Sequence, residues 1–205
     1  MNPEPVSLLL RRIWHYGKDF LCRPNNFVET VLSFNSSTDY IRWARNDSLQ
    51  PQWDERTQII AEYIPPGADV IEFGAGRQVL RWCLPHNCKY YPSDLVARTP
   101  DTIVCDLNVT YPDLGSGMGV AVFSGVLEYI RDISSVFGWL HGQVGRVVFS
   151  YATLEHTPSP LMRRQNGWVS DFTQDQIVQI VTQMGFEGGP VARWRGHVIF
   201  VVTRS

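Results

Sequence analysis

The sequence predicts an α/β protein with a mostly parallel, seven-stranded sheet, helices on both faces and an antiparallel last strand. Short apolar runs alternate with segments of helical spacing from about residue 53 onward, and such alternation is typical of a parallel sheet. Only Gly196 separates the last two apolar runs, 190–195 and 197–203, so these two strands must pair antiparallel. A length of 205 residues suits one main domain with a substantial core.

The composition excludes several classes of protein. A net charge of −2 with interspersed acidic and basic residues argues against a nucleic-acid partner. The four cysteines form no C-x-x-C pair and have no histidine at metal spacing, so we expect free thiols and no metal site. No apolar run reaches the roughly 20 residues of a membrane span. Together these features predict a cytoplasmic protein.

The first 50 residues are predicted to form a helical appendage. Apolar residues recur at helical spacing over 6–22, a second short helix is expected over 27–34, and a helical turn over 40–43. We expect this appendage, with His15 and Tyr16, either to cover the site or to mediate homodimer formation.

The main domain, residues 51–205, is predicted to open with a helix over 53–64. Its inner stripe is Ile59, Ile60, Tyr63 and Ile64, and Pro65-Pro66-Gly67 ends it. A first strand follows over 70–73, and then a helical segment over 77–84.

Four more strands complete the parallel part of the sheet. They are expected over 89–91, with the strand ending near Asp94, and over 102–105, 119–123 and 145–150, with a helix after Leu127. A long loop over 151–172 comes next. Thr173-Gln174-Asp175-Gln176 has the form of a capping box and predicts a helix from there through Met184, ended by Gly185.

The most informative motif is the first strand and the turn after it, Asp69-Val70-Ile71-Glu72-Phe73-Gly74-Ala75-Gly76. Glycines permit a tight turn and let the main chain approach a ligand closely. Glu72 would repel the anionic pyrophosphate of a dinucleotide, whereas it would attract a ligand that carries an ammonium group and ribose hydroxyls. S-adenosylmethionine is such a ligand.

From residue 53 to 205 the chain resembles the class I S-adenosylmethionine-dependent methyltransferases, which have a Rossmann-like sheet with an antiparallel last strand. Their acidic residue and G-x-G turn correspond to Glu72-Phe73-Gly74-Ala75-Gly76, which implies contact with the methionine end of the cofactor. Many members have a third glycine where this chain has Gln78. Asp94, followed by Leu95, stands 20 residues after Gly74 and corresponds to the carboxylate that binds the ribose hydroxyls.

The resemblance continues after the next two strands. Asp106-Leu107-Asn108 matches the acidic residue near the adenine amino group, and Ser124 and Gly125 match the segment that lines the cofactor. Relatives often have Leu-Glu-His where this chain has Leu127-Glu128-Tyr129, so Tyr129 replaces a familiar candidate base.

The resemblance implies methyl transfer from S-adenosylmethionine, with S-adenosylhomocysteine as product, by direct in-line displacement. Its acceptor is expected to be a small molecule. Candidate catalytic residues are His156 and Glu155 in the long loop, where His156 would titrate near neutrality and act as a base. Arg163 and Arg164 in the same loop could bind an anionic acceptor.

Two alternatives remain open. An NAD(P)-dependent oxidoreductase would use the same turn and Asp94, but it would need a third glycine where this chain has Val79. A methyltransferase fold without catalytic activity, which serves as a binding scaffold, is excluded by no single residue.

Overall fold

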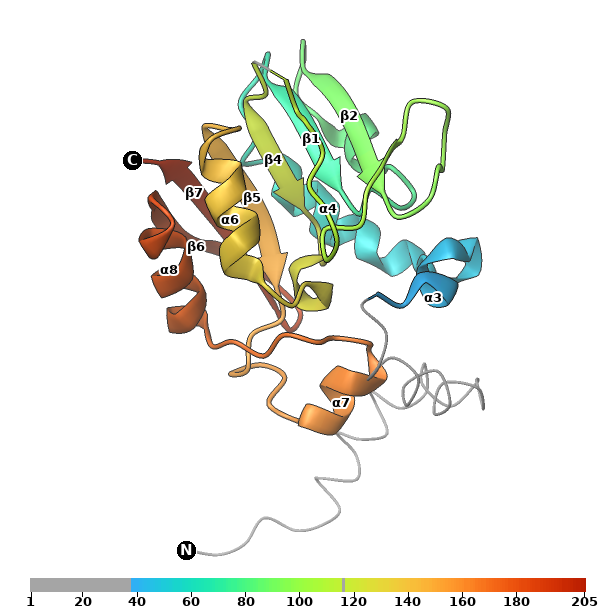
Figure 1. Ribbon diagram of the computed structural model, residues 1–205, viewed down its shortest axis with the longest axis vertical. Coiled ribbons are helices and arrows are strands. Elements are labelled where there is room, and N and C mark those ends of the chain that lie inside the picture. The colour runs from blue at the N-terminus through green and yellow to red at the C-terminus, as the bar shows by residue number, and fades with distance from the viewer. Residues whose placement is uncertain (1–37, 116) are drawn as a thin grey trace, which may run out of the picture.

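The structure, a computed structural model, describes residues 38–115 and 117–205, which form a seven-stranded sheet flanked by helices (Figure 1). The strand order is β3-β2-β1-β4-β5-β7-β6. The first five strands are parallel, β7 is antiparallel to both of its neighbours, and the predicted fold class is confirmed. The bounds of the strands are β1 Asp69–Phe73, β2 Lys89–Asp94, β3 Ile103–Val104, β4 Val120–Phe123, β5 Arg146–Tyr151, β6 Phe186–Trp194 and β7 His197–Arg204.

Helices cover both faces of the sheet (Figure 1). Helices α4 (Asp54–Ala61) and α5 (Leu80–Cys83) enclose one apolar cluster with the sheet, which includes Ile60 and Leu80. Helices α6 (Ile133–His141) and α8 (Gln174–Gln183) enclose the other. β1, β4 and β5 are almost entirely buried because both of their faces are covered, which explains why they appear in the sequence as continuous apolar runs.

Two helices are shorter than the sequence predicts. Helix α5 begins at Leu80 rather than at 77, because Gly76 and Gln78 have positive φ angles of 49° and 55° that no α-helix accommodates. Helix α4 ends at Ala61, although Ile64 beyond it is still buried. The capping box at Thr173 is present, with Thr173 and Gln176 each bonding the other's backbone N–H.

The sequence did not predict α7 (Pro160–Gln165), which lies inside the long loop and is capped by Ser159. Arg163 of α7 is 0% exposed and holds this loop together. Its guanidinium donates to Asp171 Oδ1 at 2.5 Å, to the Ala152 carbonyl at 2.6 Å and to the Ser170 carbonyl at 2.7 Å. Arg164 also binds Asp171 and the Trp168 carbonyl. Both arginines therefore have partners within the loop.

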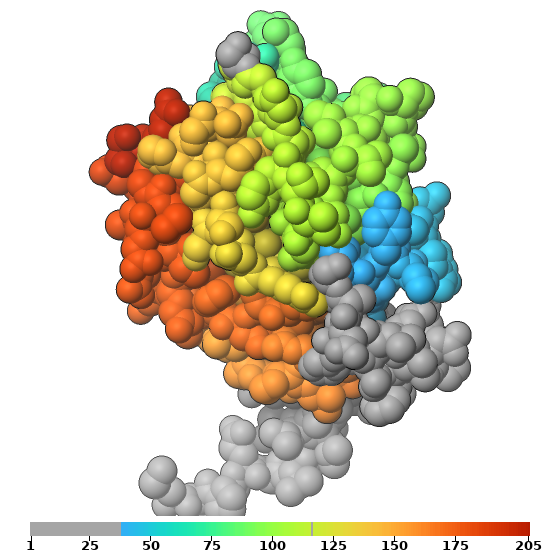
Figure 2. All heavy atoms as spheres, viewed as in Figure 1, coloured from blue at the N-terminus to red at the C-terminus, as the bar shows by residue number. Residues whose placement is uncertain are grey.

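The predicted helical turn near residue 40 is confirmed as α3 (Tyr40–Ala44). The described residues also form 3-10 turns, of which η1 (Asn46–Ser48) and η2 (Pro51–Trp53) follow α3, and η3 (Leu127–Tyr129) follows β4. The α3 segment lies against the chain that follows β2 (Figure 2). Arg98 donates to the carbonyls of Trp43 and Ala44 and, at 2.8 Å, to Asn46 Oδ1. The helices expected over 6–22 and 27–34, with His15 and Tyr16, lie outside the described residues.

In the part of the chain that the structure describes, no helix is both long and apolar enough to cross a membrane.

Replacement of Arg163 by methionine should lower the free energy of unfolding by about 3 kcal/mol or more, because it leaves buried acceptors without their cation. The matched control is Arg204→Met, which removes an exposed guanidinium with one bond to a carbonyl and should change stability by about 0.5 kcal/mol or less. Urea denaturation measures both variants. Equal effects would show that Arg163 does not stabilise the loop.

Candidate functional site

A cavity of about 670 Å³ lies at the carboxyl ends of the parallel strands, within the roughly 300–1,000 Å³ usual for ligand pockets. The segment over 38–57 and the loop over 165–169 form its other walls. Every residue that the sequence predicted to bind the cofactor lines this cavity: Glu72, Phe73, Gly74, Ala75, Gly76, Asp94, Leu95, Asp106, Leu107, Ser124 and Gly125. The sequence-based grouping of these residues into one site is consistent with the geometry.

The turn after β1 has the backbone conformation that its glycines suggest. Gly74 and Gly76 have φ angles of 63° and 49°, and a Cβ on Gly74 would lie 2.5 Å from Val126 Cγ2. Gln78, where many relatives have a third glycine, adopts positive φ as well, and its Nε2 donates to Thr99 Oγ1 at 2.8 Å. That bond stabilises a conformation which costs a non-glycine residue free energy.

Glu72 is a buried carboxyl group at the floor of the cavity. Its side chain is 2% exposed and accepts a hydrogen bond from the Tyr90 hydroxyl at 2.5 Å. The pKa of Glu72 is raised to about 8, chiefly by burial and in part by the charge of Asp94, while the Tyr90 hydrogen bond and Arg56 act to lower it. Glu72 is therefore mostly protonated at neutral pH, and a cation placed beside it would favour its ionised form.

Two further carboxylates lie along the same edge of the sheet. Asp94, at the end of β2, accepts a bond from the Gly76 N–H at 2.7 Å, which fixes the carboxylate beside the glycine turn. Asp106 follows β3 and accepts from Asn108 N–H and from Thr38 Oγ1, both at 2.9 Å. The segment before α3 is therefore joined directly to the predicted adenine side of the cavity.

Arg56 of α4 is a buried cation beside Ser124 and Gly125. Its Nε donates to Ser124 Oγ at 3.2 Å and its Nη2 to the Ser124 carbonyl at 2.9 Å. A Cβ on Gly125 would lie 2.3 Å from Arg56 Nη1, so only glycine permits this approach. The guanidinium also lies 6.0 Å from the centre of the Trp53 ring and 5.4 Å from that of Trp194.

Aromatic side chains form another part of the cavity wall. The ring of Trp43 lies 4.8 Å from that of Tyr129 and 6.2 Å from that of Trp53, centre to centre. Trp168 donates from Nε1 to the Tyr129 hydroxyl at 3.1 Å. All four rings line the cavity, so the wall presents flat apolar surface to a bound molecule.

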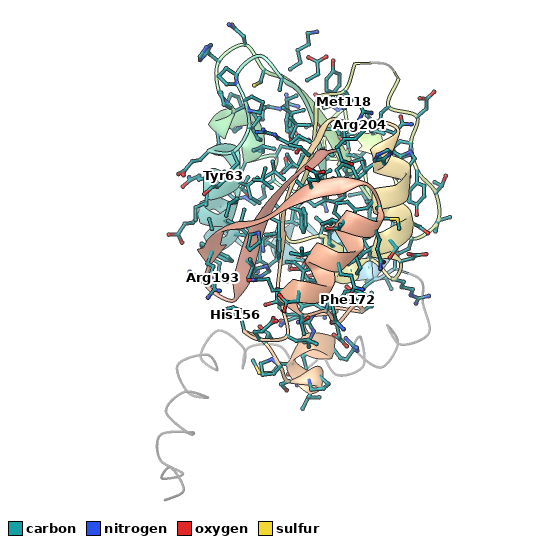
Figure 3. The ribbon with its side chains drawn as sticks, turned by 90° about the vertical axis from the view of Figure 1, so that its left-hand side faces the viewer. Tyr63, Met118, His156, Phe172, Arg193 and Arg204 are labelled. Atoms are coloured by element: carbon teal, nitrogen blue, oxygen red, sulfur yellow. The ribbon has the colours of Figure 1, made fainter. Side chains whose placement is uncertain are left out.

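The candidate catalytic residues His156 and Glu155 do not line the cavity. His156 Nδ1 lies 3.1 Å from Thr153 Oγ1 and its Nε2 lies 3.2 Å from Arg193 Nη1, at the end of the β6–β7 hairpin (Figure 3). Glu155 accepts from the Gln174 N–H at the start of α8, at 2.9 and 3.2 Å from its two oxygens. Both side chains therefore have their partners outside the cavity, and their catalytic role remains a prediction.

The sequence reasoning missed His197, which lines the cavity at the start of β7. Its Nδ1 lies 3.1 Å from Oε1 of Glu128, a carboxylate that is 0% exposed and that also accepts from the Ala152 N–H at 2.7 Å. A signal was present: His197 directly follows the hairpin turn, and the first residue of an antiparallel strand next to β5 lies at the carboxyl edge of the sheet.

The protonation states of this pair follow from their surroundings. Burial, together with the charges of Arg56 and Arg163, lowers the pKa of His197, and the neighbouring Glu128 offsets this only in part. Burial would raise the pKa of Glu128, but His197 and the charge of Arg56 hold it below its usual value. The pair is therefore a neutral imidazole against an ionised carboxylate near pH 7.

No group of three or more histidine, cysteine, aspartate or glutamate side chains in the described ranges is arranged to hold a metal ion.

The glycine turn, the acidic residues at successive strand ends and the strand order define a nucleotide-type binding site on an α/β sheet. Residues 40–188 match the family described as Methyltransferase domain. The chain belongs to this family, which confirms the predicted class of enzyme.

Several solved structures have a similar fold. The chain is similar to the protein bound to the Trm112 methyltransferase activator of Haloferax volcanii (TM-score 0.61, 11% identity, 78% of this chain and 93% of that one). It is also similar to an S-adenosylmethionine-dependent methyltransferase of Mesorhizobium loti (TM-score 0.58, 14% identity, 71% of this chain and 96% of that one). A third similar structure is human N-acetylserotonin methyltransferase, in complex with S-adenosylmethionine (TM-score 0.61, 14% identity, 84% of this chain and 57% of that one). No curated protein gives a significant sequence match.

The raised pKa of Glu72 predicts how stability depends on pH. Because the folded-state pKa is about 8 and the reference value is 4.5, the folded protein holds a proton that the unfolded chain has lost, and stability falls as pH rises between these values. Glu72→Gln removes this effect while it keeps an acceptor for Tyr90. Relative to wild type it should gain a few kcal/mol between pH 5 and pH 8.5, since one pKa unit corresponds to about 1.4 kcal/mol.

Urea denaturation of the ligand-free protein at both pH values tests this. Glu187→Gln, a matched change at an exposed position of β6, should follow the wild type. A stability difference between Glu72→Gln and wild type that does not change with pH would contradict the proposed protonation of Glu72.

Proposed function

We propose that this protein transfers the methyl group of S-adenosylmethionine to a small-molecule acceptor by direct in-line displacement. The observation that carries the proposal is the buried carboxyl of Glu72 beside the Gly74–Gly76 turn, in one cavity with Asp94 and Asp106. Membership in the methyltransferase domain family supports it.

The residues of the cavity suit this cofactor. Glu72 would compensate the positive charge of the methionine end, and the glycine turn offers close approach to its backbone. Asp94, fixed by Gly76 N–H, would bind the ribose hydroxyls, and Asp106 would face the adenine amino group. A dinucleotide fits less well because Glu72 opposes a pyrophosphate, and Gln78 and Val79 follow the turn where the dinucleotide motif requires its third glycine.

S-adenosylmethionine, when bound, supplies a methyl group that is already activated on a sulfonium. The protein's own contribution is then to align the acceptor and exclude water. Two walls serve this purpose: the aromatic cluster of Trp43, Trp53, Tyr129 and Trp168, and the loop that Arg163 holds in place.

The size of the cavity supports a small acceptor. About 670 Å³ accommodates a cofactor and one compact molecule beside it. Arg42, Trp43 and Leu49 line the cavity, which supports the proposal that the first 50 residues cover the site. Self-association through that segment stays a prediction.

Isothermal titration calorimetry with S-adenosylhomocysteine and with NADH tests the cofactor assignment. We expect S-adenosylhomocysteine to bind and NADH not to bind. Glu72→Gln and Asp94→Asn should each weaken that binding at least tenfold, or about 1.4 kcal/mol, because Asp94→Asn loses a carboxylate that faces the ligand and Glu72→Gln loses a group that the ligand's ammonium would ionise. Glu187→Gln should bind as the wild type does.

Binding of NADH alone would favour the oxidoreductase alternative, and binding of neither ligand would favour the scaffold. Unchanged affinity in both site variants would contradict the assigned roles of Glu72 and Asp94.

A further inference from the structure

We infer that the acceptor is a flat aromatic molecule with a phenolic hydroxyl, and that His197, positioned by Glu128, removes the proton of that hydroxyl. The inference rests on the proposed methyl transfer and names its acceptor. Three independent features carry it: the His197–Glu128 pair, the aromatic wall and the charge of Arg56.

The His197–Glu128 pair has the geometry of a base and its positioning residue. Nδ1 of His197 is buried and lies 3.1 Å from Glu128 Oε1, within ion-pair distance, although the two atoms do not form a regular hydrogen bond. The exposed part of the ring, 12% of the side chain, therefore lies away from Nδ1, and the residue lines the cavity. Nε2, on the other side of the ring from the Nδ1 contact, is the atom available to an acceptor.

The cost of burying Glu128 points to a function rather than to stability. Its side chain is 0% exposed, and Oε2 has no hydrogen-bond partner among the described residues. A carboxylate so placed loses its hydration and regains only part of it through Ala152 and His197. Such incompletely satisfied buried groups often have a catalytic role.

The aromatic wall selects a flat acceptor. Trp168 contacts the His197 ring edge to face at 5.9 Å, and its Nε1 bonds the Tyr129 hydroxyl. The rings of Trp43 and Trp53 continue the same wall. Because aromatic rings pack favourably on one another, a planar acceptor against this wall would place its substituents beside His197.

The local charge favours an acceptor that becomes negative. Arg56 is 5% exposed, lines the cavity and hydrogen-bonds Ser124, and its positive charge acts there together with the neighbouring Glu72 and Glu128. It would stabilise a developing phenolate and oppose an acceptor that carries an ammonium group.

The strength of the base also separates the hydroxyl classes. Burial keeps His197 a weak base, with a lowered pKa. A phenol has a pKa of about 10, whereas an unactivated hydroxyl resembles water, at about 15.7. A weakened imidazole can deprotonate the first far more readily than the second.

The reaction step balances as follows. The phenol oxygen gives its proton to His197 Nε2 and forms a bond to the methyl carbon, while the carbon–sulfur bond breaks and its electron pair stays on sulfur. The imidazolium that results faces Glu128, and it returns to the neutral form by losing the proton to solvent.

The experiment compares catechol with 4-nitrocatechol, whose hydroxyl ionises so readily that it needs little help from a base. His197→Gln should lower kcat for catechol 100-fold or more, the usual range for loss of a general base. It should lower kcat for 4-nitrocatechol less than tenfold and leave the affinity for S-adenosylhomocysteine unchanged. His86→Gln, at an exposed position before the start of β2 that does not line the cavity, is the matched control and should resemble the wild type.

Glu128→Gln tests the positioning residue. The charged groups that act on His197 are Glu128, Arg56 and Arg163, and loss of the carboxylate leaves only the two cations. In the plot of kcat against pH for catechol, the rise on the acidic side should therefore move to lower pH. The maximal kcat should fall, with little change in KM.

Equal losses for the two phenols in His197→Gln would overturn the base assignment. Catechol that fails to quench tryptophan fluorescence in the presence of S-adenosylhomocysteine would overturn the acceptor class, as would transfer to tryptamine or methyl glucoside but not to either phenol. In these cases binding of S-adenosylhomocysteine still supports the proposed methyltransferase, because only its loss counts against that function.

Discussion

The parallel pairing of β1 with β2 and β4 determines where the polar groups of the cavity lie. Phe73, the last residue of β1, is in register with Ser93 and with Phe123, so three chain segments leave the sheet at the same edge. Glu72, Asp94 and Ser124 meet there although more than 50 residues separate the first from the last. The tight turn at Gly74 follows from the same constraint, because the chain must clear the side chain of Val126.

The site concentrates charge in a place where charge is costly. Glu72, Glu128 and Arg56 are each less than 6% exposed, and a core of apolar residues of similar volume would be more stable. The loop that closes the cavity relies on a further buried cation, Arg163, whose partners are all within that loop and the end of β5. The fold thus gives up stability at the edge where a ligand can restore it, as is common in enzymes.

Local pattern was enough to predict that the strands form this sheet and to place the candidate cofactor residues at one edge of it, although their role in binding stays a prediction. Turn glycines and strand-end carboxylates are close in sequence to the strands that place them, so Glu72, Asp94 and Asp106 could be assigned to one edge. The aromatic wall could not be predicted, because Trp43, Tyr129 and Trp168 come from three distant segments. Helix α7 was missed because its six residues show no apolar periodicity, and a single buried arginine stabilises it.

His197 was missed for a topological reason, and that reason separates the two halves of the site. β7 lies between β5 and β6 and runs against β5, so its first residue, not its last, is at the carboxyl edge. The residues proposed to bind the cofactor follow β1, β2, β3 and β4, whereas His197 belongs to a hairpin with no part in that pairing. Because the hairpin touches the cavity only at its turn, changes there can alter the acceptor's surroundings while the register that positions Glu72 and Asp94 stays the same. The Glu128 carboxylate, placed by η3 a few residues after β4, is the point where the two halves meet.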